Sequence, residues 1–363
     1  MKFMYQTYKP LFNKHISNQL NNAADRLGKK LNQLKIAELA ISQYNAQYLA
    51  HDHLNNLTST LQKYVYILGS CIQSTQLPIN EITFLEYGGG IGILSLLARE
   101  AGVKSVLYND IYNISVQDAQ NIATHLGLTA NHYIPGDIDD VINYLKNNNI
   151  ACHAVGSYDV IEHVYDIDVF LKKLSSLSKA KNFTLFMSSG ANTLNPRIKN
   201  KLIKHHHEHE YQTRQTTSGH KQRDCLEGFL SVRRNIIKEY APALSDAELN
   251  HLAQATRGKI KNDIYTTIDT YKKNKLLPAI PITSDTCDPH TGNWSEHLLD
   301  PYHLKNILYK QGLNAQVLCG YYGHQSRTIK KYVCNLFNAC ITFAPTTLAL
   351  RLAPFYTIYG KKN

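Results

Sequence analysis

The chain has 363 residues, and its hydrophobic content of 43% favours a well-packed globular protein that is longer than one usual domain. Its 39 Lys and Arg against 28 Asp and Glu give a net charge of +11, which favours an acidic partner: a phosphorylated or carboxylated metabolite, an anionic lipid surface or a nucleic acid. The basic residues are scattered in small groups, without the Arg-rich tract or aromatic–basic alternation of RNA binding, so we expect no DNA partner, and the pattern disfavours RNA.

Cysteines and apolar runs indicate the compartment. The seven cysteines are odd in number and form no C-x-x-C pair, which is typical of reduced, buried thiols in a cytoplasmic protein. The N-terminus lacks the apolar stretch of a signal peptide. The most membrane-like run, residues 339–359, is interrupted by Pro345, Arg351 and Pro354. We therefore expect no transmembrane span there, but a buried helix followed by a last strand at 355–359.

The first 78 residues are expected to form an N-terminal helical segment, 1–78. Residues 1–30 are polar with weak periodicity, whereas apolar residues recur at helical spacing from Leu31 to Ser74, which predicts two or three amphipathic helices. Pro78 ends this segment before the first strand.

A glycine-rich turn follows the first predicted strand. The strand, residues 82–85, ends in the carboxylate Glu86, and glycines follow at every second position: Gly88, Gly90 and Gly92. An acid followed by glycines at a strand-to-helix turn indicates a nucleotide-cofactor site. A dinucleotide site would need its third glycine at position 93, which is Ile, and a P-loop would need Gly-Lys-Ser/Thr, which is absent.

The remaining pattern, acid-x-G-x-G-x-G, resembles the first motif of class I S-adenosylmethionine (SAM) methyltransferases. A carboxylate at Glu86 would repel a pyrophosphate but attract the cationic methionyl end of SAM. Glycines would let the backbone pass close under the cofactor. The resemblance covers residues 82–190 and resumes at 297–360. It implies an α/β fold of Rossmann-like type, with a seven-stranded, mostly parallel sheet and helices on both faces.

Acids at the ends of the next two strands fit the same cofactor. The second strand, residues 105–110, ends in Asp110, which is placed to accept the ribose hydroxyls. The third strand leads to Asp137, and the resemblance implies that this acid pairs with the adenine amino group. Asp139 and Asp140 compete for that role, and a turn or helix N-cap is the structural alternative for Asp137. The predicted cofactor is SAM, and the product is S-adenosylhomocysteine.

The fourth strand carries candidates for the reaction. It is predicted over residues 157–163, and the run 159–166 (Asp-Val-Ile-Glu-His-Val-Tyr-Asp) is similar to the strand-four signature of small-molecule methyltransferases. Methyl transfer often requires removal of a proton from the acceptor, and Glu162 with His163 is the best-placed pair for that role. In the resembled family this neighbourhood lies near the transferred methyl. The alternative is that Glu162 caps the next helix and His163 packs under it.

Residues 191–296 interrupt the alternation of strands and helices. The SAM-binding core is expected at 79–190, and its last helix and strand pair at 297–363. We predict helices in the interruption over 196–211, 223–240, 246–256 and 260–275. In the resembled fold this place overlies the active site, so we expect a helical lid that shapes the substrate pocket.

A histidine-rich run lies on the first of these helices, at residues 205–210. His205 and His209 share one face at i,i+4 spacing, but two ligands do not make a metal site. A solvated polar face is the structural alternative. We place His205, His209 and the nearby Arg214 among the substrate contacts, and a divalent metal is allowed but not expected.

A polar loop at residues 286–297 contains the only Trp of the chain. Loops that carry such side chains where a chain returns to its core often serve function. We place Asp288 and Trp294 among the substrate contacts, and His290 and His297 among the candidate bases. The alternative is a hydrogen-bonded loop with Trp294 as its plug.

The sequence therefore predicts a cytoplasmic SAM-dependent methyltransferase that acts on a small molecule, and the charge favours an anionic one. Oxygen is the predicted acceptor atom, because a histidine base is available and the Asn/Asp-Pro-Pro-Tyr motif of N-methyltransferases is absent after strand four. Three alternatives stay open: an RNA or protein methyltransferase, a non-catalytic SAM-binding or scaffold protein, and a metal-dependent enzyme that uses the histidine-rich helix.

Overall fold

The computed structural model describes residues 10–215, 221, 223–323 and 329–362. The chain divides into two compact units. The core unit comprises residues 1–160, 168–190 and 300–363, and the insertion unit comprises residues 161–167 and 191–299.

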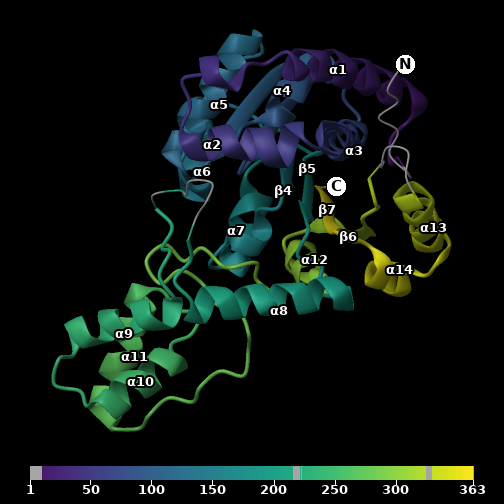
Figure 1. Ribbon diagram of the computed structural model, residues 1–363. Coiled ribbons are helices and arrows are strands. Elements are labelled where there is room, and N and C mark those ends of the chain that lie inside the picture. The colour runs from purple at the N-terminus through teal and green to yellow at the C-terminus, as the bar shows by residue number, and fades with distance from the viewer. Residues whose placement is uncertain (1–9, 216–220, 222, 324–328, 363) are drawn as a thin grey trace. The chain divides into compact units, whose positions relative to one another are not determined.

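In the part of the chain that the structure describes, the core unit contains a seven-stranded sheet with the order β3-β2-β1-β4-β5-β7-β6. Strands β4 to β7 are labelled in Figure 1. The strands are β1 (Thr83–Tyr87), β2 (Ser105–Asp110), β3 (His132–Pro135), β4 (Ala154–Tyr158), β5 (Thr184–Ser189), β6 (Leu313–Cys319) and β7 (Tyr356–Lys362). Strands β1 to β5 pair in parallel, and β7 runs antiparallel to both β5 and β6. The predicted mostly parallel sheet with an antiparallel last strand is confirmed.

Helices cover both faces of this sheet. Alternate side chains of a strand point to opposite faces, so each strand contributes side chains to the packing on both. Phe84 of β1 belongs to a hydrophobic cluster with side chains of four helices, α1 (Lys14–Asn32), α3 (Leu57–Thr75), α4 (Ile93–Glu100) and α5 (Asn113–Leu126). On the other face, Tyr87 meets Phe170 of α7 (Ile167–Ser176), with ring centroids 5.1 Å apart. Helices α6 (Ile138–Asn147) and α12 (Pro301–Lys310) complete the alternation of strands and helices.

The ends of β1, β2 and β3 lie together at one edge of the sheet. Tyr87 is paired with Asn109, and Asp110 is paired with Pro135. The residues that follow these strands therefore emerge side by side. This edge is where open α/β sheets bind their ligands.

The N-terminal helices begin earlier than predicted. Helix α1 lies mostly within residues 1–30, a stretch that is polar and weakly periodic in its apolar residues. Its buried residues recur at helical spacing: Leu20, Ala23, Ala24, Leu27, Gly28 and Leu31. The small residues among them allow close packing but add little to the apolar pattern, and this concealed the helix. Next come α2 (Gln43–Tyr48) and the π-helix η2 (Leu49–Leu54).

Strand β4 ends earlier than the sequence predicted. The segment expected as a strand to residue 163 leaves the sheet after Tyr158, and Ile161–His163 form a short 3₁₀ turn, η4. The strand stops where Asp159 takes a left-handed backbone conformation with φ of +53°. Placing Glu162 and His163 at the strand end was therefore wrong, since both lie in the insertion unit.

The apolar run at 339–359 is not a buried helix. It is divided among the end of α13 (Ile329–Phe343), α14 (Thr346–Leu352) and β7. Asn338 is the one buried residue of α13, all of which is described, and Cys340, expected to be buried, is exposed. None of the helices in the described residues has the length and apolarity that a bilayer crossing requires.

The insertion unit is helical, as predicted. Its helices are α8 (Pro196–Tyr211), α9 (Phe229–Tyr240), α10 (Asp246–Ala255) and α11 (Lys261–Asn274). Helix α9 begins six residues later than expected, at Phe229. A hydrophobic cluster of α9, α10 and α11, separate from that of the core unit, includes Ile236, Ile237, Leu252, Ile264 and Ile268. The insertion unit therefore has a core of its own.

Candidate functional site

The turn between β1 and α4 requires glycine at the three predicted positions. Gly88, Gly90 and Gly92 have φ values of +66°, +56° and +78°, a left-handed region that other residues rarely adopt. Space is restricted as well, because a Cβ atom on Gly88 would lie 2.6 Å from a methyl group of Val160. The alternating glycines are thus required by the turn itself, before any cofactor is considered.

Strand β2 holds the peptide groups of Gly90 from both sides. Asp110 Oδ2 accepts a hydrogen bond from the Gly90 N–H at 2.9 Å, and the Tyr108 hydroxyl donates to the Gly90 carbonyl. Asp110 Oδ1 accepts from the Tyr112 N–H at 2.8 Å. The Asp110 carboxylate therefore accepts the hydrogen bond of a backbone N–H group that, in a dinucleotide-binding turn, would be free to bind a pyrophosphate. This arrangement disfavours a phosphate and favours a cationic ligand.

Glu86 lies beneath the turn and fastens it to α4. The side chain is buried, and Oε2 accepts a hydrogen bond from the Ser95 N–H in the first turn of that helix at 2.8 Å. Burial raises the pKa of the Glu86 carboxyl to about 7, although the hydrogen bonds from Ser95 act in the opposite direction. A buried carboxyl with this pKa responds to a positive charge placed nearby.

Asp137 is the N-cap of α6. Its Oδ1 accepts from the N–H groups of Asp139 and Asp140, and Asp140 in turn accepts from the Asp137 N–H at 2.9 Å. The capping role that the sequence left open is confirmed. Its contact with an adenine group stays a prediction.

The N-terminal segment is fastened beside the turn. Asp118 of α5 accepts hydrogen bonds from the N–H and hydroxyl of Ser42 at 3.0 and 2.5 Å, and from the side-chain amide of Asn45 at 2.7 Å. Tyr48 faces the turn, where a Cβ atom on Gly90 would lie 3.5 Å from its ring. The leading helices therefore border the predicted cofactor site.

A buried histidine next to Tyr48 escaped the sequence analysis. His53 lies in η2, is 7% exposed, and its ring centroid is 4.7 Å from that of Tyr48. Neither ring nitrogen has a hydrogen-bond partner among the described residues. Burial and the nearby Lys63 lower the pKa of His53 to about 4, so the ring is neutral at pH 7. One signal was present in the sequence, because His53 falls four residues from both Leu49 and Leu57, within an apolar stripe.

Lys63 connects this region to the end of β4. Its Nζ lies 4.0 Å from the ring centroid of Tyr158, the last residue of that strand. Burial lowers the pKa of Lys63, while the carboxylate of Asp159 acts to raise it. Asp159 Oδ1 also accepts from the Gly190 N–H at 2.7 Å, which connects the ends of β4 and β5. Lys63 thus lies at the end of β4, while Tyr48 lies against the turn and has His53 beside it.

In the insertion unit, the structure brings His163 together with the loop 286–297. His163 Nδ1 lies 2.8 Å from the carbonyl oxygen of Trp294, and Nε2 lies 3.8 Å from the carboxylate of Glu296. A carbonyl can only accept, so Nδ1 carries a proton and the lone pair of a neutral ring lies on Nε2. Glu162 is fully buried, and its carbonyl accepts from the His297 N–H at 2.9 Å. His163 is the member of the predicted pair that is oriented as a base.

Helix α8 contributes two predicted residues to the same neighbourhood. The rings of His205 and His209 lie 4.0 Å apart, and His209 Nδ1 is 2.6 Å from Ser295 Oγ. Arg214 Nη1 lies 3.0 Å from His209 Nδ1, and a guanidinium only donates. Burial first, and then His205 and Arg214, lower the pKa of His209 to about 2, so it is neutral. The histidine cluster is defined here as His163, His205, His209, Arg214 and Glu296.

Other predicted residues of the loop support the loop itself. Asp288 is buried, and both of its carboxylate oxygens accept hydrogen bonds from backbone N–H groups at 2.8 Å. Trp294 is stacked between Tyr165 and His297, at centroid distances of 6.0 and 4.2 Å, and donates to the Tyr165 carbonyl. Trp294 is thus the plug that the structural alternative described. His290 is exposed on the adjoining turn.

The second i,i+4 pair of α8, His206 and Glu210, is structural. Both side chains are buried, and Arg233 donates two hydrogen bonds to Glu210, the shorter at 2.5 Å. The Thr286 hydroxyl also donates to Glu210, at 2.7 Å. Among the described residues, no group of three His, Cys, Asp or Glu side chains is arranged to hold a metal ion.

Comparison with known proteins finds similar solved structures. No family model matches the chain, and no curated protein matches it either. The similar structures include PKMT2 from Rickettsia typhi, also solved with AdoHcy (14% identity, TM-score 0.39), the CurJ carbon methyltransferase (12%, 0.39) and an O-methyltransferase family protein from Burkholderia thailandensis (10%, 0.34). They align with 79%, 96% and 96% of this chain and with 50%, 66% and 72% of their own chains. The chain thus spans about half the length of PKMT2. At such identity, cofactor, acceptor and reacting residues must be inferred from its own side chains.

Proposed function

We propose that the chain is a class I SAM-dependent methyltransferase. The observation that carries this proposal is the turn after β1. Its three alternating glycines adopt the left-handed conformation, and the N–H of the middle one, Gly90, donates a hydrogen bond to the carboxylate of Asp110. Two more acids, Glu86 and Asp137, lie at or just after the ends of neighbouring strands. A site that presents carboxylates, and not free backbone N–H groups, suits a ligand that carries an ammonium and a sulfonium but no phosphate. SAM is such a ligand, and when bound it supplies an electrophilic methyl group.

Each of the three acids would interact with a different part of the cofactor. Asp110 would accept the ribose hydroxyls, because each carboxylate oxygen has two lone pairs and only one backbone bond is made by each here. Asp137 would accept from the adenine amino group beside its capping bonds. Glu86, beneath the turn, would act through its charge on the methionyl end rather than through a direct bond.

For the acceptor, we propose a small molecule with a reacting hydroxyl, recognised by the histidine cluster. Arg214 supplies a positive charge there, which favours an anionic acceptor. His163 Nε2 would take the hydroxyl proton as the acceptor oxygen takes the methyl group, while the Trp294 carbonyl keeps Nδ1 protonated. His53 is a poorer candidate for the base, because a pKa of about 4 leaves little driving force for proton removal at pH 7.

Calorimetric titration with SAM tests the cofactor assignment. Asp110→Ala removes charge-assisted hydrogen bonds worth about 1.5–3 kcal/mol each, so we expect SAM affinity to fall by at least about tenfold. Asp246→Ala, at an exposed acid of α10, is the matched control and should leave the affinity unchanged. Wild-type affinity in folded Asp110→Ala and Glu86→Ala variants would overturn the assignment.

The acceptor can be found with methyl-labelled SAM and a cell extract, followed by mass spectrometry of the labelled fraction. A labelled small molecule is the expected result. With that molecule as substrate, His163→Asn should retain SAM affinity and lose about a hundredfold or more in rate, whereas His125→Asn, an exposed histidine of α5, should lose nothing. Label in RNA or protein would favour those acceptors, and SAM binding without transfer to any fraction would favour a non-catalytic protein.

A further inference from the structure

The net charge of the chain arises entirely from its two terminal stretches. Residues 1–24 and 301–363 contain eleven Lys and Arg and no Asp or Glu. Residues 25–300 hold the other 28 basic residues and all 28 acidic ones. Both stretches belong to the core unit, and the C-terminal one includes α13 and α14.

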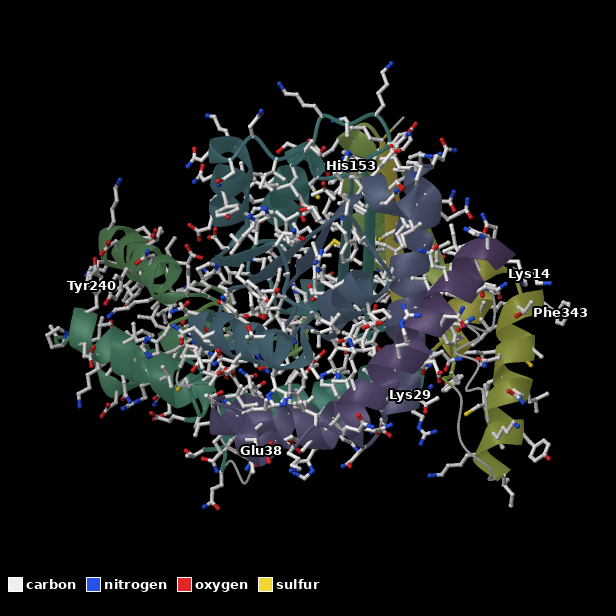
Figure 2. All side chains as sticks on the ribbon, turned by 90° about the horizontal axis from the view of Figure 1, so that it is seen from above. Lys14, Lys29, Glu38, His153, Tyr240 and Phe343 are labelled. Carbon is white, nitrogen blue, oxygen red and sulfur yellow. The ribbon has the colours of Figure 1, made fainter. Side chains whose placement is uncertain are left out.

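Helix α13 turns an apolar stripe toward the solvent. Its exposed apolar residues recur every three or four positions and so share one face: Ile329, Tyr332, Val333, Leu336 and Phe337. Tyr332 is 76% exposed, Leu336 65% and Phe343, at the end of the helix, 86%. Figure 2 shows Phe343 projecting outward from the end of α13. Such a stripe normally faces the core of a protein.

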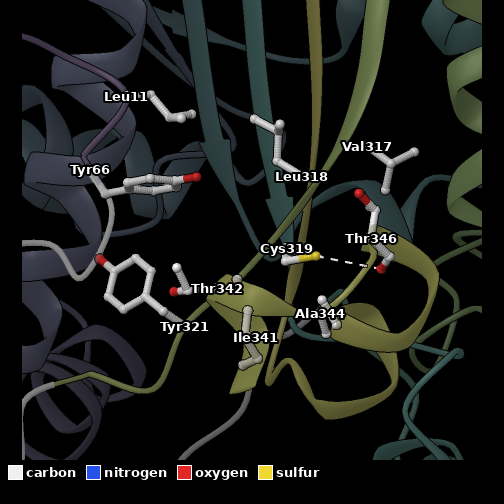
Figure 3. Close-up of a pocket in the computed structure, with 12 residues that line it drawn as sticks. Leu11, Tyr66, Val317, Leu318, Cys319, Tyr321, Ile341, Thr342, Ala344 and Thr346 are labelled. Carbon is white, nitrogen blue, oxygen red and sulfur yellow. Dashed lines mark hydrogen bonds between the residues drawn. The ribbon is translucent and has the colours of Figure 1, made fainter. Parts of the chain in front are cut away.

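The opposite face of α13 is held by polar contacts. Asn338, its buried residue, accepts from the Tyr322 N–H at 2.8 Å and donates to the Tyr322 carbonyl at 3.0 Å. Nearby, Ile341 and Thr342 line a cavity of about 180 Å³ together with Leu11 and other residues (Figure 3). Helix α13 therefore buries no apolar side chain, although all of its residues are described. At the edge of the stripe, Phe337 contacts the Tyr322 ring, with centroids 5.6 Å apart. The packing of the described residues does not account for the other, more exposed side chains of the stripe.

We propose that α13 is an interfacial helix that binds an anionic lipid surface. Its stripe would enter the boundary between head groups and acyl chains, where an amphipathic helix gains from burying aromatic and aliphatic side chains. Lys330 beside the stripe and Arg351 of α14 are exposed and would meet the negative head groups. The absence of acids from the surrounding sequence removes the repulsion that such a surface would otherwise cause.

Charge favours a lipid surface over the other occupants. A second copy of the chain would bring two acid-free stretches together, and like charges would oppose that contact. A nucleic acid would match the charge but leave Leu336 and Phe343 in water. Anionic lipid matches both the charge and the apolar stripe.

Vesicle sedimentation with the full-length protein tests this proposal. We expect binding to phosphatidylcholine vesicles that contain about one-third phosphatidylglycerol, and at least about tenfold weaker binding to pure phosphatidylcholine. The triple variant Tyr332→Ser, Leu336→Ser and Phe343→Ser should lose at least about tenfold on the anionic vesicles. The matched control replaces three exposed apolar residues elsewhere, Leu276, Ile282 and Tyr309, by Ser and should bind like the wild type.

Circular dichroism and light scattering establish the folding and the oligomeric state of each variant. Circular dichroism must show both triple variants folded, since the replaced side chains are exposed. Phe337→Trp should show a blue shift of its fluorescence with anionic vesicles that the wild type, whose one Trp is Trp294, does not show. Failure of the wild type to bind anionic vesicles, or equal binding by the two triple variants, would overturn the proposal. So would a dimer, seen by light scattering, that the α13 variant dissociates, because the stripe would then be an interface between copies.

Discussion

The cost in stability of adding a side chain at a left-handed glycine depends on the atoms that surround it. Gly88 and Gly127 share a φ of +66°, but a Cβ atom on Gly88 meets Val160 at 2.6 Å while one on Gly127 meets nothing within 4 Å. Gly127→Ala should therefore lose only about 1–2 kcal/mol of the free energy of unfolding, from backbone strain. Gly88→Ala should lose about 1–3 kcal/mol more, from overpacking. Urea denaturation measures both, and Val160→Ala should restore part of the loss in Gly88→Ala. Equal losses at the two sites would contradict the contact with Val160.

Glu86 is expected to make the stability of the fold depend on pH. Its folded pKa, about 7, lies above the ordinary value of 4.5, so the folded state holds the proton more tightly than the unfolded state. The contribution of this carboxyl to stability is fully present below pH 4.5 and is lost as pH rises through 7, by up to about 3 kcal/mol. Glu86→Gln should therefore gain stability relative to the wild type between about pH 5 and 8, as measured by denaturant titration. A difference between the two proteins that does not change with pH would refute the raised pKa.

The sequence could locate these residues but not all of their partners. Glu86 and Asp110 were predictable because strand ends and glycines are local patterns. The hydrogen bonds that Glu86 accepts from Ser95 and Asp110 accepts from Gly90 depend on how α4 and the turn pack. The spacing of residues in the sequence does not predict that packing. His53 was missed for the same reason, since its place beside Tyr48 depends on Asp118 fastening α2.

At the scale of elements, boundaries were predictable where local signals set them. Helix α8 begins and ends as predicted, because Asn195 caps it and Pro196 takes its first position. Strand β4 was placed wrongly because its end is set by Asp159, whose carboxylate is bonded to Gly190 of a neighbouring segment. The apolar run at 339–359 predicted a buried helix, but its start belongs to the exposed end of α13, since apolarity alone does not say which surface will cover a helix.

The whole chain contains two units, each with a hydrophobic cluster of its own, and this predicts that they lose structure separately. The buried ion pair Arg233–Glu210 allows the insertion unit to be destabilised selectively, because Arg233→Met leaves the Glu210 charge without its partner at 2.5 Å. Breaking such a pair costs about 3–5 kcal/mol. Arg234→Met, which removes a surface ion pair with Asp246, should cost at most about 1 kcal/mol and is the matched control.

Hydrogen exchange read by mass spectrometry should then separate the two units. In Arg233→Met, amides of α8 to α11 should exchange faster than in the wild type and in Arg234→Met. Amides of β1, β2 and β4 should keep their protection, because their bonds and their hydrophobic cluster lie in the core unit. SAM affinity should also be retained, since the acids proposed to hold the cofactor are all in that unit. Faster exchange in both units to the same extent would show that the chain unfolds as one cooperative body, and that the insertion unit is required for the fold of the sheet.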